Sequence, residues 1–119
     1  MEQSIFSVDG HGIAEVVADG VVIRNAQDAL DLIAEAGARG AYAVILDEKH
    51  LTPAFFDLKT RLAGEILQKH ANCGTKVAII GEFEKFQGKS PRAFIVESNR
   101  GDLVFFVSDR EAAVARLAR

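Results

Sequence analysis

The sequence has few of the residues that cross-link or stiffen a chain, since its 119 residues include one cysteine and two prolines. It also has no tryptophan. The single cysteine, Cys73, excludes an intramolecular disulfide and a zinc site built from several cysteines. No uninterrupted apolar run approaches ~18 residues, so we expect no membrane span. The first residues show no basic stretch followed by an apolar one, and the expected location is therefore the cytoplasm.

An excess of charge of one sign is also missing. The chain has 14 Lys+Arg against 17 Asp+Glu, a formal net charge of -3. A weakly acidic chain is not expected to bind nucleic acid through its phosphates. Hydrophobic residues make up 49% and charged residues 26%, the usual composition of a folded soluble domain, which excludes a disordered chain. We expect a single domain over residues 1–119, because domains of about this length are common.

Motifs that carry catalysis or bind metal are missing as well. The sequence contains neither a G-x-S-x-G nucleophile elbow nor a phosphate-binding P-loop. The three histidines, His11, His50 and His70, form no H-x-x-x-H pair, and no further ligand lies near His70 and Cys73 in the sequence. We interpret His70 as a core residue or a partner of a helix dipole. No metal and no cofactor are expected, and a non-enzymatic protein is favoured over an enzyme.

Short apolar runs bounded by glycine and polar residues predict β-strands. We expect six of them, at residues 5–8, 13–17, 21–23, 42–46, 76–80 and 103–107. Turn signals at residues 9–12 and 19–20 separate the first three runs, which predicts an antiparallel meander. The run at 42–46 is apolar throughout, as is typical of a central strand that is covered on both faces.

Apolar residues at helical spacing predict four helices, at residues 26–36, 52–70, 91–100 and 109–117. Asn25 is expected to cap the first helix, and Thr52 the second, with Pro53 at the first helical position. Ser108 and Glu111 form the pattern of a capping box before the last helix. Because strands and helices alternate after Asn25, the expected fold is α/β: a mixed sheet, antiparallel first and parallel afterwards, with helices on both faces.

Polar residues follow the predicted strands at the edge where ligands bind in open α/β sheets. This edge should carry Asp47, Glu48, His50 and Glu82. These residues are candidates for binding a ligand or a partner. The alternative is that they are the ordinary polar surface of loops, since strand ends are polar in most α/β proteins.

Lys59 is a further candidate because it falls on the apolar side of the predicted helix at 52–70. A lysine in that position must reach solvent, pair with an anion or lose its charge. It lies about one turn into the helix, near the edge that carries Glu48. We expect an ion pair between Lys59 and Glu48, either structural or part of a ligand site.

Two phenylalanines, Phe83 and Phe86, stand three residues apart in a polar loop after a strand. Two interpretations remain open for them. They fold back onto the neighbouring helix, or they form the apolar lip of a pocket or partner surface.

Most of the chain from Asn25 to Leu117 resembles a bacterial family of unknown function, numbered four-one-eight-zero in the series of domains of unknown function. The resemblance is carried by six segments, residues 25–32, 55–60, 63–69, 76–81, 97–99 and 105–107. It implies an aromatic residue at the position of His70, which agrees with a core role. The family implies no activity.

The order of predicted elements is also similar to the STAS fold of anti-sigma-factor antagonists. Those proteins carry a phosphorylated serine or threonine at the start of the helix after the central strand. Residues 47–53 depart from that pattern, because they contain no Ser-Gly pair and Thr52 is the nearest hydroxyl. A phosphorylation switch is therefore not expected.

The sequence favours a regulatory or protein-interaction module without catalytic activity. One alternative is a module that binds a small molecule or lipid, with Lys59 as the anion anchor and the Phe83/Phe86 loop as an apolar wall. A third, less favoured class is an enzyme that uses Glu48 and Lys59, or Glu82, as acid and base. If the chain forms an oligomer, a symmetric homodimer is the expected form.

Overall fold

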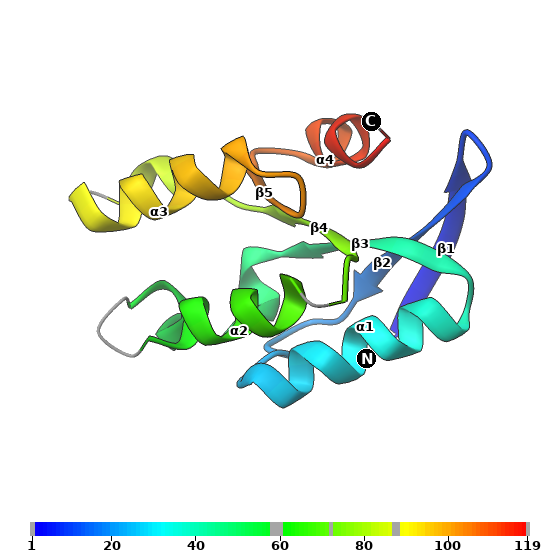
Figure 1. Ribbon diagram of the computed structural model, residues 1–119, viewed down its shortest axis with the longest axis horizontal. Coiled ribbons are helices and arrows are strands. Elements are labelled where there is room, and N and C mark those ends of the chain that lie inside the picture. The colour runs from blue at the N-terminus through cyan, green and yellow to red at the C-terminus, as the bar shows by residue number, and fades with distance from the viewer. Residues whose placement is uncertain (1, 58–60, 72, 87–88, 119) are drawn as a thin grey trace.

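The computed structural model describes residues 2–57, 61–71, 73–86 and 89–118. Within these residues, five strands form one sheet in sequence order: β1 (Glu2–Val8), β2 (His11–Val17), β3 (Ala41–Asp47), β4 (Lys76–Ile80) and β5 (Val104–Val107). The pair β1 and β2 is antiparallel, and each later pair is parallel (Figure 1). The mixed α/β sheet that the sequence predicts is thus confirmed.

Four α-helices pack around this sheet: α1 (Ala26–Ala38), α2 (Leu62–Ala71), α3 (Lys89–Arg100) and α4 (Arg110–Leu117). The helices α1 and α2 lie below the sheet in Figure 1 and α4 lies above it. Helix α3 lies beside β5. The described chain contains no helix long and apolar enough to cross a membrane.

Strand β3 supplies both cores, because alternate residues of a strand point to opposite faces. Val44 and Leu46 join the core under α1 and α2, whereas Ala43 and Ile45 join the core under α4. All four side chains are buried. The apolar run at 42–46 is therefore central, as predicted, and its two-sided burial explains why it does not alternate between apolar and polar residues.

Helix α3 closes the outer edge of the sheet with a side chain. The amide nitrogen of Asn99 donates to the carbonyl of Phe106 at 3.2 Å, and the Phe106 N–H donates to the amide oxygen of Asn99 at 2.7 Å. Asn99 thereby satisfies backbone groups that an edge strand otherwise leaves unpaired.

The predicted caps are confirmed at one helix and displaced at another. Asn25 caps α1, because its side chain accepts from the N–H of Asp28 at 2.8 Å. At α4 the cap is Asp109, which accepts from the N–H of Ala112 at 2.7 Å. The prediction of Ser108 as the cap is wrong by one residue, since aspartate is as good a cap as serine and both precede the helix.

The predicted third strand at 21–23 is wrong. Only Ile23 pairs, in an isolated parallel bridge with Leu51. The segment is held instead by one acceptor, because the N–H groups of Val22 and Ile23 both donate to the carbonyl of His50, at 2.8 and 3.0 Å. The segment therefore runs beside the chain that follows β3 and adds no strand to the sheet.

The continuous helix predicted at 52–70 is also wrong. A 3-10 turn, η2 (Pro53–Phe56), ends before Asp57, and α2 begins only at Leu62, after Arg61 adopts a left-handed φ of 61°. Pro53 does occupy the first helical position, but the Thr52 side chain makes no capping bond. The tight turn allows consecutive rings to pack. Phe55 is buried, and the ring of Phe56 meets it edge-on with 4.9 Å between the ring centres.

We predict opposite effects of alanine at two glycines. A methyl group at Gly12 would lie 2.5 Å from the backbone oxygen of Gly40, whereas one at Gly37 in α1 meets nothing within 4 Å. Gly12→Ala should lower the free energy of unfolding by about 1–3 kcal/mol through overpacking. Gly37→Ala should raise it by up to about 1 kcal/mol through helix propensity. Urea denaturation of both variants measures this, and equal stabilities would contradict the close approach of β2 to Gly40.

Candidate functional site

The carboxyl ends of β3 and β4 border an open hollow of about 480 Å³. Its walls come from the loop before α1, from the chain after β3 and from the chain after β4. We call it the strand-end hollow, and its lining residues are Val21, Glu48, Lys49, Leu51, Pro53, Phe56, Lys85 and Phe86. Its position agrees with the expectation that ligands bind beyond the carboxyl ends of parallel strands.

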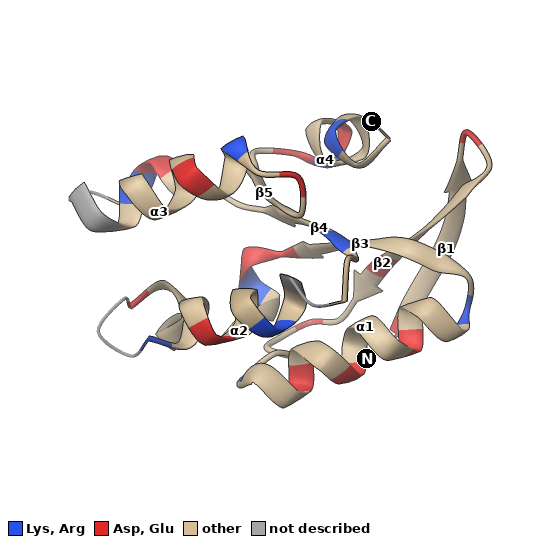
Figure 2. Ribbon diagram, in the orientation of Figure 1, with Lys and Arg blue, Asp and Glu red and all other residues tan. Residues whose placement is uncertain are grey.

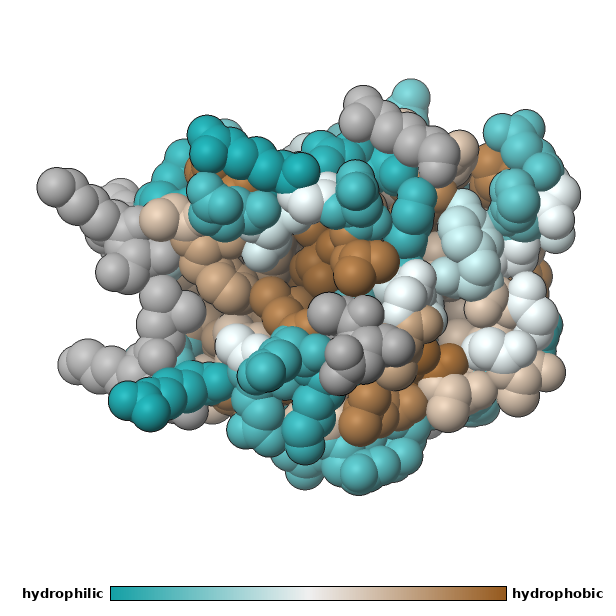
Figure 3. Space-filling model, viewed as in Figure 1, coloured by the Kyte–Doolittle hydropathy of each residue, from teal (hydrophilic) through white to brown (hydrophobic). Residues whose placement is uncertain are grey.

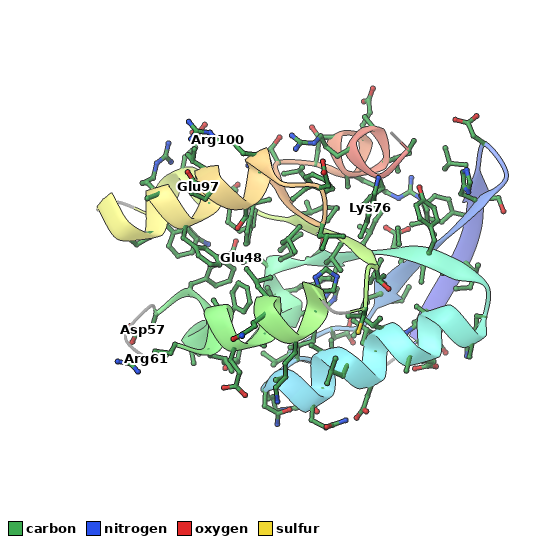
Figure 4. The ribbon with its side chains drawn as sticks, in the orientation of Figure 1. Glu48, Asp57, Arg61, Lys76, Glu97 and Arg100 are labelled. Carbon is green, nitrogen blue, oxygen red and sulfur yellow. The ribbon has the colours of Figure 1, made fainter. Side chains whose placement is uncertain are left out.

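Glu48 is the first residue of the 3-10 turn η1 (Glu48–His50), and it forms the charged part of the hollow with Lys85. The Lys85 Nζ lies 2.5 Å from Glu48 Oε2. Lys85 belongs to another 3-10 turn, η4 (Phe83–Lys85), which follows β4. In the view of Figure 4, Glu48 lies between α2 and α3. The Lys85 side chain is 53% exposed, so the pair stabilises the fold by no more than about 1 kcal/mol.

Gly81 explains how Glu48 reaches its position. A methyl group at Gly81 would lie 2.7 Å from Glu48 Oε1 and 2.8 Å from Phe83 Cζ. Only a residue without a side chain lets both groups approach the end of β4 this closely. The Glu48 carboxylate therefore rests against the backbone of β4, and its second oxygen meets Lys85.

An aromatic wall faces the same hollow. The rings of Phe56 and Phe86 stack at 4.9 Å, and Lys85 Nζ lies 5.5 Å from the centre of the Phe86 ring. Phe83 lies deeper, 8% exposed and 5.1 Å from the ring of Phe106. Phe83 thus packs into the core against β5, whereas half-buried Phe86 lines the hollow, and a binding role for this loop stays a prediction. Figure 3 shows apolar side chains exposed in the recess between α2 and α3.

His50 has a structural role and does not line the strand-end hollow. It is buried, its Nδ1 accepts from the N–H of Asp47 at 2.9 Å, and its Nε2 donates to the carbonyl of Ala18 at 2.9 Å. Since a carbonyl only accepts, this geometry requires a proton on Nε2. Through these two hydrogen bonds, the ring connects the end of β3 to the chain that follows β2.

Asp47 and His50 lie together at a second open depression of about 450 Å³. Four of its nine lining residues are acidic, Glu2, Glu15, Asp19 and Asp47, and Lys49 lines it as well. Within the described part of the chain, no three side chains of His, Cys, Asp or Glu are arranged to hold a metal ion. Elsewhere, acidic and basic positions are interspersed along α2, α3 and α4 (Figure 2).

The structure thus brings together only part of the predicted site. Glu48, Phe83 and Phe86 lie close to one another, whereas Glu82 is exposed to solvent. Lys59 lies outside the described residues, so its ion pair with Glu48 stays a prediction. Lys85, the cation on Glu48, was not among the residues predicted from the sequence. In a parallel sheet the loop after β4 lies beside the end of β3, and this adjacency could have indicated Lys85.

A separate cavity of about 40 Å³ lies between α1, α2 and the sheet. Its lining residues are apolar except for one, His70. Helix α1 contributes Ala29, helix α2 contributes Ile66, and strands β4 and β5 contribute Val77 and Val104.

His70 is 3% exposed, and neither ring nitrogen has a hydrogen-bonding partner of standard geometry among the described residues. Burial lowers the pKa of His70 below 6.5, and a backbone hydrogen bond of non-standard geometry with Thr75 opposes this effect more weakly. The core position expected from the sequence is therefore observed. The lack of partners of standard geometry distinguishes His70 from His50, whose two nitrogens are both bonded.

The fold, with the strand-end hollow at the carboxyl edge of its sheet, defines an α/β protein with a mixed sheet and a candidate binding edge. A family model for a domain of unknown function (DUF4180) matches residues 8–117. The chain belongs to this family, as the sequence resemblance predicted. No curated protein and no solved structure shows a significant match to the chain. The likeness to the STAS fold therefore stays a prediction.

We predict that His70 makes stability depend on pH. In the unfolded chain it titrates near 6.5, and in the folded chain at lower pH. The unfolded state therefore binds more protons in this window, and the free energy of unfolding falls as the pH is lowered from about 7 to about 5. His70→Phe should remove this pH dependence and, by removing two nitrogens that lack partners of standard geometry, raise the free energy of unfolding by up to about 1–3 kcal/mol. Denaturant titrations at several pH values measure both effects, and parallel profiles for the two proteins would contradict the assignment.

Proposed function

We propose that the chain is a non-enzymatic, cytoplasmic regulatory module that binds a partner protein at the strand-end hollow. The observation that carries this proposal is the half-buried aromatic wall of Phe56 and Phe86 beside the Glu48–Lys85 ion pair. Aromatic side chains with charged groups at their rim are typical of the residues that dominate protein interfaces.

The charges indicate what the partner presents. Glu48 and Lys85 neutralise each other, and exposed Lys49 forms no ion pair within the described residues. Lys49 therefore adds a positive charge beside the apolar wall, at the border with the second depression, which it also lines. A partner segment with one apolar anchor and a neighbouring carboxylate complements this surface, because the carboxylate meets Lys49 while the anchor packs on the rings.

The catalytic alternative has less support from the same geometry. It requires either Glu48 acting with Lys59, which lies outside the described residues, or Glu82, which is exposed to solvent. The described contacts of Glu48 are with Lys85 and with the end of β4, which hold its carboxylate in one place. A small-molecule site is favoured by a different observation, the His70 cavity, and not by the hollow.

The test compares two lysines that have the same exposed fraction and the same kind of ion-pair partner. Lys85 in the hollow and Lys69 in α2 are each 53% exposed, and each pairs with one glutamate. We expect Lys85→Glu to weaken capture of the partner by at least about tenfold, whereas Lys69→Glu leaves it unchanged. Quantitative mass spectrometry of proteins captured by the wild-type chain and both variants measures this, followed by calorimetry with the purified partner.

The role proposed for the charge of Lys49 is tested by Lys49→Glu, which should weaken capture of the same partner. Capture that is equally strong for the wild-type chain and for both hollow variants would overturn the proposal. Equal loss in Lys85→Glu and Lys69→Glu would also overturn it, because a general charge effect would then explain the binding.

A further inference from the structure

We propose that the cavity under α1 and α2 is a second site, which binds a small, uncharged and largely apolar molecule through one hydroxyl or carbonyl group held by His70. This site goes beyond the proposed partner surface. It lies on the inner side of the helices, and its chemistry differs from that of the strand-end hollow.

The walls of the cavity set the apolar part of the ligand. Ala29 of α1, Ile66 of α2, Val77 of β4 and Val104 of β5 present only carbon to the space between them. The volume of about 40 Å³ exceeds the roughly 10–15 Å³ that one water molecule needs. It accommodates a group of a few heavy atoms, and its lining favours carbon over water.

His70 sets the polar part of the ligand. Its ring is 3% exposed and lines the cavity, and neither nitrogen has a partner of standard geometry among the described residues. A polar group without a good partner in a protein interior is unfavourable. A ligand group that hydrogen-bonds to the ring removes this cost, and the apolar part of the same ligand gains contact with the walls of the cavity. A water molecule fits poorly because it needs two to four polar partners and the side chains of the lining offer one.

The ligand is uncharged because nothing in the lining compensates a charge. His70 is the sole titratable side chain among the residues that line the cavity. Burial lowers the pKa of His70, so the ring is neutral near pH 7. A neutral imidazole has one donor and one acceptor, which suits a hydroxyl or a carbonyl. A carboxylate or an amine would lose its hydration without gaining an opposite charge.

The experiment uses ethanol and 1-propanol, whose few heavy atoms match the volume of the cavity, and the 1-chloroalkanes of the same chain length. Each is titrated into the full chain, and the ring nitrogens of His70 and the methyl groups of Ala29 and Ile66 are followed by NMR. We expect saturable shifts at these groups and at least about fivefold tighter binding of the best alcohol than of its chloroalkane. The ring of His50, whose nitrogens are already bonded, is the internal control and should not shift.

Two variants assign the binding to this cavity. His70→Phe should keep the shape of the site and abolish the preference for alcohol over chloroalkane. Ala29→Leu should fill the cavity and weaken both classes of probe. Lys85→Glu, which weakens capture of the partner, should leave the titration unchanged, so failure of one proposal is distinguishable from failure of the other.

The wild-type chain alone is sufficient to overturn the inference, even where a variant does not fold. Absence of a saturable shift at His70, or equal affinity for alcohols and chloroalkanes, would show that His70 is only an unpaired core residue. Binding that persists undiminished in a folded Ala29→Leu variant would place the probes elsewhere and overturn it as well.

Discussion

The position of the chain after β3 depends on one buried side chain, His50. Its ring bonds to the N–H of Asp47 and to the carbonyl of Ala18, and its own carbonyl accepts from Val22 and Ile23. Residues 18–23 and 47–50, which are distant in sequence, are therefore joined around one residue. Losing the ring would leave two half-buried backbone groups unpaired at once, the N–H of Asp47 and the carbonyl of Ala18.

Leu51, which follows His50, connects the two hollowed regions. It lines both the strand-end hollow and the cavity that contains His70. The next element, η2, also borders both spaces, because Phe55 lines the cavity and Phe56 lines the hollow. A short turn with adjacent aromatic rings thus separates an internal space from an external surface. A helix through the same residues would turn successive side chains by ~100° and give this segment a different set of contacts.

The two buried histidines show why residue type alone does not identify a site. Both are more than nine-tenths buried, but His50 has a partner for each nitrogen and His70 has none of standard geometry among the described residues. From the sequence, His50 was expected in the candidate site and His70 in the core. The contacts indicate the opposite roles, because a ring with both nitrogens bonded stabilises the fold, whereas a ring that lacks such partners and faces a cavity can bind a ligand.

The sequence by itself determined the α/β class, the change from antiparallel to parallel pairing in the sheet and the cap at Asn25, because these depend on local spacing and on two-sided burial of apolar runs. The family was indicated by the resemblance of six sequence segments. Only the tertiary structure decided that residues 21–23 add no strand, that the predicted helix breaks before Leu62, and that Lys85 is the cation on Glu48. These features depend on contacts between segments that are far apart in the chain. Periodicity contains no information on which distant donor a carbonyl such as that of His50 will meet, or on whether a buried ring such as His70 will find a partner.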